Sequence, residues 1–302
     1  MGMRGAGLPT LGALLLACAA PSRSQALYSG SEMRTRETYI YGRFEARMRA
    51  APGSGLVSAF FTYSDLSYPQ WNEIDVEILG RYRNEVQLNH IIGQAGSEQH
   101  HVVRDTLAFN PHADFHAYAF SWYPDSVVWQ VDGVRVHKSA QGVKGILNKP
   151  QQIMLTLWAS SADSWVGPFS ASILPAYAFC DWVSFAAYTP KAGPGGSDFT
   201  PRWRDDFNGW DDARWLKSTH TYPRNLAQFH PGNVIVKGGQ AILGLTEKGR
   251  EGFTGIVPDG LRGRGLGAGA PRGHSDRAAP PGLIAGTGTW ALRWFLIDGK
   301  AL

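Results

Sequence analysis

The chain has 302 residues, 29 Lys and Arg against 25 Asp and Glu, and a formal net charge of +4. This length is enough for one large all-β domain or two smaller domains. Because the net charge is small and much of the basic excess lies in the Arg-rich ends, the composition argues against a nucleic-acid partner. Eleven Trp and eleven Tyr suit either aromatic packing between sheets or a surface on which sugars stack.

The first 26 residues have the pattern of an export signal. Arg4 precedes an apolar run of ten residues from Leu11 to Ala20, and Ser24-Gln25-Ala26 fits a small-x-small cleavage site. This run is too short to span a bilayer, so no transmembrane segment is predicted. We therefore expect a secreted or periplasmic protein with a signal peptide at residues 1–26. An alternative is a lipoprotein signal, in which Cys18 becomes the lipidated first residue.

Removal of a signal peptide would leave Cys180 as the only cysteine. An intrachain disulfide would then be impossible. The surrounding residues, FCDWVSF, favour a small apolar side chain within a strand.

Short strand patterns fill the chain from Tyr39 to Tyr188. Apolar and polar residues alternate at 43–50, which is typical of a half-buried strand. Asp132-Gly133 lies between two β-favouring runs and predicts a hairpin. Other β-favouring runs lie at residues 56–64, 85–92, 115–123, 151–159 and 179–188. Many strands separated by turns predict an all-β fold, here a two-sheet jelly-roll sandwich.

The remaining sequence divides into three segments. Residues 190–201 are rich in Pro, Gly and Ser and are interpreted as a linker after a main part at residues 27–189. Residues 202–257 contain a hairpin pattern about Gly238-Gly239. Residues 258–302 begin with a Gly-, Arg-, Ala- and Pro-rich run, so we expect a disordered, low-complexity tail.

The stretch WNEIDVEILG places Glu73, Asp75 and Glu77 at alternate positions, with aliphatic residues between them. Alternate side chains of a strand share a face, so the three carboxylates would lie together. Neighbouring carboxylates repel and raise one another's pKa, which costs stability. A solvated surface strand is the simpler alternative. Trp71 and Leu79 continue the same face, however, and their apolar character favours a functional use.

Paired carboxylates of this kind suit glycoside hydrolysis, in which one attacks the anomeric carbon and the other transfers a proton. Like-charge coupling separates the two pKa values and so assigns the two roles. The Cα atoms of Glu73 and Glu77 would be about 13 Å apart, and side chains that lean together can approach the ~5–5.5 Å of retaining enzymes. We therefore predict retention of configuration. Asp75 lies between the two and can hold their protonation state through a hydrogen bond.

WNEIDVEILG is similar to the active-site strand of glycoside hydrolase family 16, in the unbulged form E-x-D-x-E that occurs in lichenases, the endo-β-1,3-1,4-glucanases. The resemblance implies Glu73 as nucleophile, Asp75 as its electrostatic helper and Glu77 as acid/base. It also implies a concanavalin-like jelly roll with a substrate cleft. Further segments resemble successive strands of the family, in order, at residues 41–64, 86–91, 115–137, 153–158 and 180–185.

The same resemblance implies substrate-binding residues that stack on sugar rings or bond their hydroxyls. These residues are Glu32, Arg34, Tyr63, Trp71, Asn89 and Trp158. Ordinary sheet packing is the alternative for each residue taken singly. Thr156 stands where lichenases commonly have Asn, and Ile91 where they often have Tyr, which leaves the subsite specificity open.

The resemblance implies no cofactor for catalysis. It does imply a structural Ca²⁺ on the side away from the cleft, held largely by backbone oxygens. The matching positions are Asp206, Gly239 and Asp181. An ordinary Asp at a strand end and an ordinary hairpin Gly are the alternative.

Residues 204–246 resemble the usual start of a family 16 domain, yet here they follow its last strand. We therefore expect a circularly permuted strand order, in which residues 202–257 complete the same jelly roll. Tyr222 and Asn225 would then reach one end of the cleft. A truncated second copy of the enzyme is the alternative.

The expected protein is a monomeric, secreted endo-β-glucanase that hydrolyses β-1,3-1,4-glucan or a related polysaccharide. An alternative within the family is a depolymerase or transglycosylase acting on a bacterial exopolysaccharide of the succinoglycan type. A non-catalytic, lectin-like protein is an alternative of another class, because jelly rolls serve both roles. An inactive remnant would result if the rearranged order prevented folding.

Overall fold

The computed structural model describes residues 26–139 and 143–256. Residues 1–25 of the predicted signal peptide, with Cys18, and the whole predicted tail at residues 258–302 lie outside the described residues. No helix among the described residues is long and apolar enough to cross a membrane. The only α-helix described is one turn, α1 (Asp163–Val166), and there are 3₁₀ turns at Asp65–Ser67, Ala171–Ile173, Pro194–Gly196 and Pro231–Asn233.

Seventeen strands carry almost all of the regular structure within the described residues. They are β1 (Tyr28–Thr35), β2 (Gly42–Arg49), β3 (Leu56–Tyr63), β4 (Gln70–Leu79), β5 (Glu85–Gln94), β6 (Gln99–His100), β7 (Val103–Thr106), β8 (His116–Trp122), β9 (Val127–Val131), β10 (Val134–Lys138), β11 (Gln152–Ala159), β12 (Ala176–Tyr188), β13 (Phe199–Asp205), β14 (Trp215–Lys217), β15 (Ala227–Phe229), β16 (Val234–Lys237) and β17 (Gln240–Glu247). The predicted all-β fold is confirmed.

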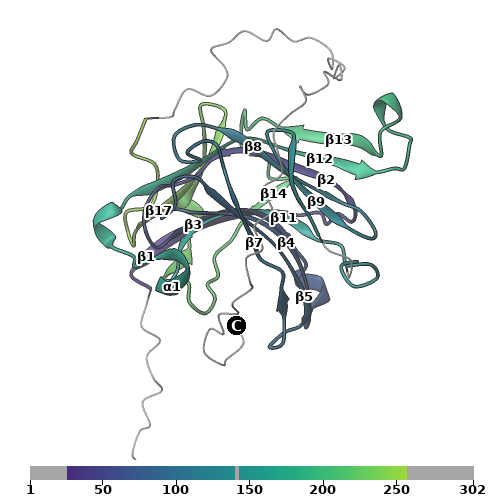
Figure 1. Ribbon diagram of the computed structural model, residues 1–302. Coiled ribbons are helices and arrows are strands. Elements are labelled where there is room, and N and C mark those ends of the chain that lie inside the picture. The colour runs from purple at the N-terminus through teal and green to yellow at the C-terminus, as the bar shows by residue number, and fades with distance from the viewer. Residues whose placement is uncertain (1–25, 140–142, 257–302) are drawn as a thin grey trace, which may run out of the picture.

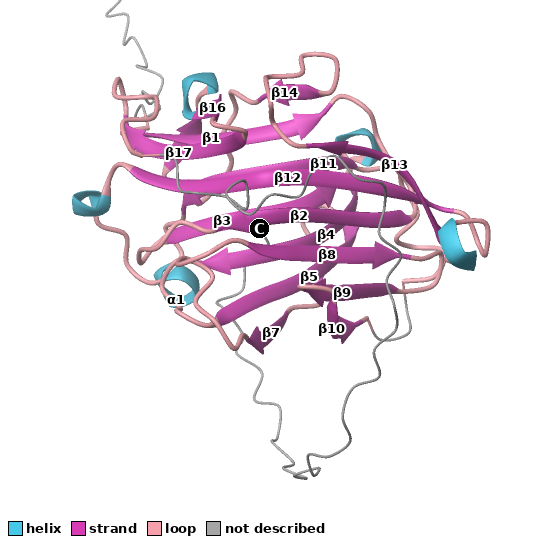
Figure 2. Cartoon of the chain, turned by 90° about the horizontal axis from the view of Figure 1, so that it is seen from above, coloured by secondary structure: helices cyan, strands magenta, loops and turns pink. Residues whose placement is uncertain are grey.

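The strands form two packed antiparallel sheets, seen as two layers in Figure 1. The cleft sheet has the order β14-β1-β11-β3-β4-β5-β7, with β6 also on β5. The outer sheet has the order β10-β9-β8-β2-β12, and the far edge of β12 pairs with both β13 and β17. The start of β1 also pairs with β17, and in parallel with β15, so β1 joins the two sheets. Figure 2 shows β12, β2 and β8 side by side.

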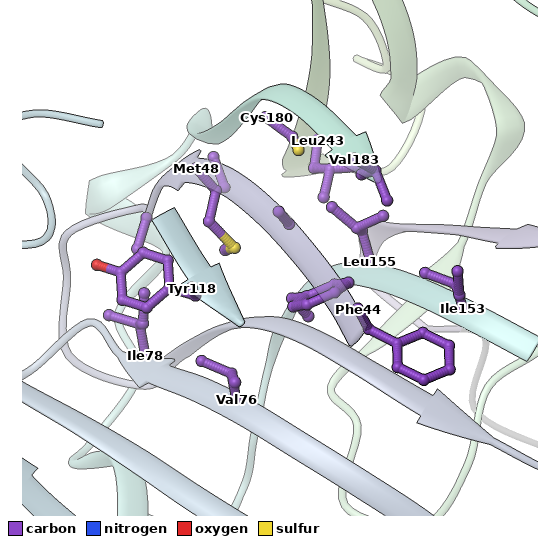
Figure 3. Packing of buried hydrophobic residues seen from close by; sticks show 14 of the residues in the cluster. Phe44, Met48, Val76, Ile78, Tyr118, Ile153, Leu155, Cys180, Val183 and Leu243 are labelled. Carbon is purple, nitrogen blue, oxygen red and sulfur yellow. The ribbon is translucent and has the colours of Figure 1, made fainter. Parts of the chain in front are cut away.

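The core lies between the sheets, and alternation along β4 decides which of its side chains enter it. Ile74, Val76 and Ile78 are at most 1% exposed and belong to the main hydrophobic cluster. Figure 3 shows Val76 and Ile78 in this cluster together with Tyr118 of β8. Each fully buried aliphatic side chain contributes roughly 1.5–3 kcal/mol. A slip of one residue would turn the β4 carboxylates into the core, so burial of these aliphatics fixes the carboxylates on the opposite face.

Both predicted hairpins are present. Asp132 and Gly133 have φ values of 49° and 79° and connect β9 to β10. Gly238 and Gly239 have φ values of 61° and 70° and connect β16 to β17. Two consecutive positive φ values are what a type I′ turn requires. The buried, free Cys180 of β12 also agrees with its predicted place in a strand.

The predicted linker is shorter than expected. Strand β13 begins at Phe199, opposite Tyr188 at the end of β12, so residues 189–198 form the loop of a hairpin. The sequence did not predict a strand here because of Pro201, since proline is tolerated in sheets only at edges and bulges. It pairs with Ala186 directly after a shift in register between Phe185 and Ala186.

Strands β13, β14, β15 and β17 belong to the same two sheets as the main part, because they pair with β1 or β12, and β16 joins them through β17. The buried Asn233 donates to the main-chain oxygen of Ser29 at 2.6 Å, and Ser29 donates to Glu251 at 2.6 Å. These contacts join the two ends of the described chain. Circular permutation of the strand order stays a prediction.

Candidate active site

The register of β4 with its neighbours arranges the three carboxylates in successive rows across the cleft sheet. Each carboxylate has one residue of β3 on one side and one residue of β5 on the other. The rows are Tyr63–Glu73–Ile91, Phe61–Asp75–Asn89 and Ala59–Glu77–Gln87. Directly paired residues on one face have Cβ atoms about 4.5–5.5 Å apart, so each row partner can touch its carboxylate.

A cleft of about 500 Å³ lies over this face of the sheet, and Glu73 lines it. Five of the six predicted substrate-binding residues also line it: Glu32, Arg34, Tyr63, Trp71 and Trp158. The sixth, Asn89, is not in the lining. It is buried beside Asp75, and its hydrogen bond lowers the pKa of that carboxyl. The cleft thus combines flat aromatic faces with groups that bond hydroxyls, as a sugar site requires.

The segment after β14 completes one wall of this cleft with His220, Tyr222 and Arg224. Ser218 donates a hydrogen bond of 2.5 Å to Glu32, which is 3% exposed. Burial raises the pKa of Glu32, and the hydrogen bond from Ser218 opposes that rise. The predicted reach of Tyr222 into the cleft is therefore seen.

Asn225 does not line the cleft. Its side-chain oxygen instead accepts a hydrogen bond of 2.9 Å from the backbone N–H of Ala227. The residue thereby shapes the turn before β15.

Glu73 is held by two donors. The indole N–H of Trp71 donates to its Oε2 at 2.5 Å, and Asp75 supplies a second hydrogen bond. Burial raises the pKa of Glu73, while these two hydrogen bonds lower it. Because both donors stabilise the negative charge, Glu73 is suited to act as the ionised member of the pair. Trp71 packs beside this residue, as expected from the sequence, and its ring lies 5.2 Å from that of Tyr63.

Asp75 is 3% exposed and lies between the other two carboxylates. Burial, followed by the charges of Glu73 and Glu77, raises its pKa well above the ordinary value. A protonated Asp75 donates its hydroxyl hydrogen to Glu73, which agrees with the opposite effects of this bond on the two pKa values. The main-chain oxygen of Asp75 accepts a hydrogen bond of 3.0 Å from Trp129 in the outer sheet, which fixes this part of β4.

Glu77 has the pKa of a general acid. Burial is the largest cause that raises it to about 7, and the charge of Glu73 adds to the rise. A hydrogen bond from Gln87 and the charge of Arg104 act in the opposite direction. Glu77 therefore keeps its proton up to neutral pH. Glu73 accepts its two hydrogen bonds as the ionised carboxylate. This difference in environment agrees with the expected roles of Glu77 as acid and Glu73 as nucleophile, which stay predictions.

Residues 12–173 match glycosyl hydrolases family 16. The chain belongs to glycosyl hydrolase family 16. It is 42% identical over 241 residues to a beta-glucanase of Fibrobacter succinogenes, covering 76% of this chain and 67% of that protein. It is 36% identical over 183 residues to a beta-glucanase of Brevibacillus brevis, covering 59% and 67%.

Among solved structures, the Bacillus licheniformis beta-glucanase is 36% identical. The match covers 51% of this chain and 70% of that chain, with a TM-score of 0.46. The family assignment itself rests on the sequence matches, and it agrees with the two-sheet jelly roll described above.

Sequence reasoning did not single out several residues of the candidate site, among them Gln87, Trp165 and His220. Gln87 could have been found, because it lies two residues before Asn89 on the same face of β5. Trp165 lies on the single turn of α1, where no periodic pattern marks it, yet it lines the cleft. His220 lies in a loop that only the fold brings to the site.

The three predicted calcium positions meet where β12 changes partner. Cys180 of β12 pairs with Ala241 of β17, and Val183 pairs with Asp205 of β13, so the gap between these pairs faces Asp181, Gly239 and Asp206. The carboxylate of Asp181 lies 2.8 Å from Arg47, and that of Asp206 lies 2.7 Å from Arg204. No group of three His, Cys, Asp or Glu side chains in the described ranges could hold a metal ion. The structural Ca²⁺ at Asp181, Gly239 and Asp206 stays a prediction.

Calcium is expected to raise the melting temperature of the protein, because an ion that binds only the folded state stabilises it by mass action. At a hundredfold excess of Ca²⁺ over its Kd the gain would be about 2.7 kcal/mol. Thermal unfolding in EGTA and in millimolar CaCl₂ measures this, with MgCl₂ as the control ion. Equal melting temperatures in all three conditions would remove the calcium proposal.

Replacement of Asp75 by Asn is expected to raise the free energy of unfolding at neutral pH. The pKa of Asp75 is higher in the folded state, so the stability that it contributes is fully present below its unfolded pKa of about 4 and falls as the pH rises toward the folded value. Asn is neutral at every pH and still has a donor for Glu73. The increase in the free energy of unfolding should therefore be larger at pH 7 than at pH 4. Each kcal/mol of increase should raise the melting temperature by about 2–4 °C.

The exposed Asp125 provides the matched control. Asp125→Asn should change the melting temperature little, and to the same extent at both pH values. If Asp75→Asn lowered stability equally at pH 4 and pH 7, Asp75 would not be a carboxyl kept neutral by its surroundings.

Proposed function

We propose that the protein is a secreted or periplasmic, monomeric endo-β-glucanase that hydrolyses β-1,3-1,4-glucan with retention of configuration. The observation that carries this proposal is the pair of carboxyls on one face of β4. Glu73 receives two hydrogen bonds at its carboxylate, and the pKa of Glu77 is raised to about 7. Membership of family 16 and the beta-glucanase relatives support the substrate class.

In the first half of the reaction, the Glu73 carboxylate attacks the anomeric carbon. Glu77 gives its proton to the leaving glycosidic oxygen as the bond to that oxygen breaks. The products are a glycosyl ester on Glu73 and a released sugar chain. Asp75 keeps its own proton and contributes a hydrogen bond to Glu73.

In the second half, the Glu77 carboxylate takes a proton from a water molecule. The oxygen of that water attacks the anomeric carbon, and the ester bond to Glu73 breaks. Glu73 is again a carboxylate and Glu77 is again protonated, so the cycle closes. Two inversions at the same carbon give net retention.

The polymer is held by the aromatic and polar lining of the cleft. Trp158, Tyr63 and Trp71 offer flat faces to sugar rings, while Glu32 and Arg34 offer bonds to hydroxyls. The lining comes from several strands of the cleft sheet and from the loop of residues 220–224. This breadth supports binding of an internal stretch of polysaccharide.

Product analysis on a panel of polysaccharides tests the proposal. Barley β-glucan and lichenan should release oligosaccharides, whereas laminarin and carboxymethylcellulose should not. Proton NMR during the first minutes should show the β-anomer before mutarotation. If no β-glucan released oligosaccharides, or if the α-anomer formed first, the proposal would be wrong.

Depolymerisation or transglycosylation of a succinoglycan-type exopolysaccharide is the second candidate. Ile91 gives the cleft an apolar side chain at a position where lichenases often have Tyr. Succinoglycan added to the panel separates the two substrates, and longer products at high oligosaccharide concentration would identify transfer. A lectin-like protein would bind glucan without any release of sugar, and Glu73→Gln with Glu77→Gln would leave that binding unchanged.

A further inference from the structure

Gln87 lies beside Glu77 in the same row of the cleft sheet and is 5% exposed. Its Nε2 donates a short hydrogen bond to Oε2 of Glu77. The two ends of a glutamine amide are nearly indistinguishable by shape, so its orientation is decided by its partners. The partners of its other end therefore decide whether Glu77 meets a donor or an acceptor.

Those partners are both donors. The indole N–H of Trp165 donates to Oε1 of Gln87 at 3.0 Å, and Nε of Arg104 donates to the same oxygen at 3.3 Å. Neither group can accept a hydrogen bond. The oxygen of the amide must therefore face Trp165 and Arg104, and the NH₂ group must face Glu77.

This orientation distinguishes the two oxygens of Glu77. Oε2 accepts the hydrogen bond from Gln87. Because an NH₂ group cannot accept a proton from the carboxyl, the acidic hydrogen of Glu77 belongs on Oε1. The proton is thus placed on one defined oxygen before any substrate binds, as pre-organised acid catalysis requires.

We propose that Trp165 and Gln87 are positioning residues that hold Glu77 with its proton on Oε1. This rests on the proposed hydrolase function. Trp165 also lines the cleft from α1, so the residue that orients Gln87 is one that the polysaccharide touches. Binding of sugar on this wall is thereby linked to the acid/base through two hydrogen bonds.

Arg104 has a smaller part. Its side chain is exposed, so solvent and salt screen its charge. Its Nη1 donates to the hydroxyl of Tyr82 at 3.2 Å, which keeps the guanidinium over β7 and β5. Trp165, only part-exposed and closer to Gln87, is therefore the main orienting donor.

The test compares two substrates that differ in their need for an acid. A β-glucan has a poor leaving group and requires protonation, whereas a 2,4-dinitrophenyl β-glycoside of a glucan oligosaccharide leaves without it. Trp165→Phe keeps a six-membered aromatic ring and removes the five-membered ring that carries the N–H. We expect kcat/KM on β-glucan, which reports the step that needs the acid, to fall roughly tenfold, a fraction of the 10²–10⁴ that a general acid supplies, and kcat/KM on the aryl glycoside to change less than twofold.

Trp158→Phe is the matched control. Trp158 lines the same wall, with its ring 5.9 Å from that of Trp165, and belongs to the substrate-binding surface. It should change KM on both substrates and leave the ratio of their kcat/KM values as in the wild type.

Gln87→Leu provides a second readout. The hydrogen bond from Gln87 lowers the pKa of Glu77, so its loss should move the alkaline limb of the kcat/KM profile to higher pH. Gln87→Asn, with the same amide on a shorter stem, should give an intermediate shift.

Two results would overturn the proposal. One is an equal fall of kcat/KM on both substrates for Trp165→Phe, and the other is an unmoved alkaline limb for Gln87→Leu with normal melting behaviour. An inactive wild type on both substrates would instead overturn the hydrolase function itself, so the two failures are distinguishable.

Discussion

Glu73→Gln should lower kcat/KM on β-glucan by at least about 10⁴-fold, the scale on which loss of a covalent nucleophile acts. Gln cannot form the glycosyl ester, so both substrates, the polymer and the activated aryl glycoside, should lose turnover. The side chain keeps its size, and Trp71 and Asp75 remain in place around it. Steady-state kinetics on both substrates measures the loss, and thermal unfolding confirms that the variant is folded.

A smaller variant at the same position gives the decisive control. Glu73→Ala opens room for an external anion, and azide should restore turnover of the aryl glycoside. The product should be the α-glycosyl azide, because a single displacement inverts the anomeric carbon. A β-glycosyl azide from this variant would mean that Glu73 is not the nucleophile.

Glu77→Gln should lower kcat/KM on β-glucan by about 10²–10⁴-fold, the range that general acid–base catalysis supplies. Formation of the glycosyl-enzyme from an activated aryl glycoside needs no acid and should be nearly unaffected. The second half-reaction should be slow, since no base remains for water.

The pH profile gives an independent check of the same residue. In the wild type, kcat/KM should fall above about pH 7, because Glu77 loses its proton there. The fall at low pH should reflect protonation of Glu73. Glu77→Gln should abolish the alkaline limb and keep the acidic one. An alkaline limb that persisted in this variant would assign the acid to another residue.

The fold and the chemistry of the site were predictable from sequence to different degrees. Alternation along β4 predicted which residues enter the core and which three carboxylates share a face, and the structure confirms both. The sequence did not predict strand β13, which begins at Phe199, because Pro201 argues against a strand except at the edge of a sheet. Local periodicity cannot show which edge a strand will occupy.

The positions of the protons could not be predicted from the sequence, for a related reason. The pKa of Glu77 depends on its burial and on Gln87, a residue ten positions away that only strand pairing brings beside it. The position of Trp165 depends on the path of the chain after β11. The sequence of that segment has no periodic pattern from which the path could be predicted. Asn89 was expected to bind substrate from the family resemblance alone. In the structure it is buried against Asp75 and does not line the cleft.

Two of the strands that pair with β1, the first strand of the described chain, come late in the sequence. Tyr28 and Ser29 of β1 pair with β17, and the opposite end of β1 pairs with β14. An incomplete chain that ends before Phe199 lacks all of these partners, so the join between the two sheets cannot close during translation. Such distant pairings slow folding, because the entropy of closing a long loop is lost before the stabilising contacts between the strands form. The two sheets of the described chain are therefore joined through β1 only after β17 has been made.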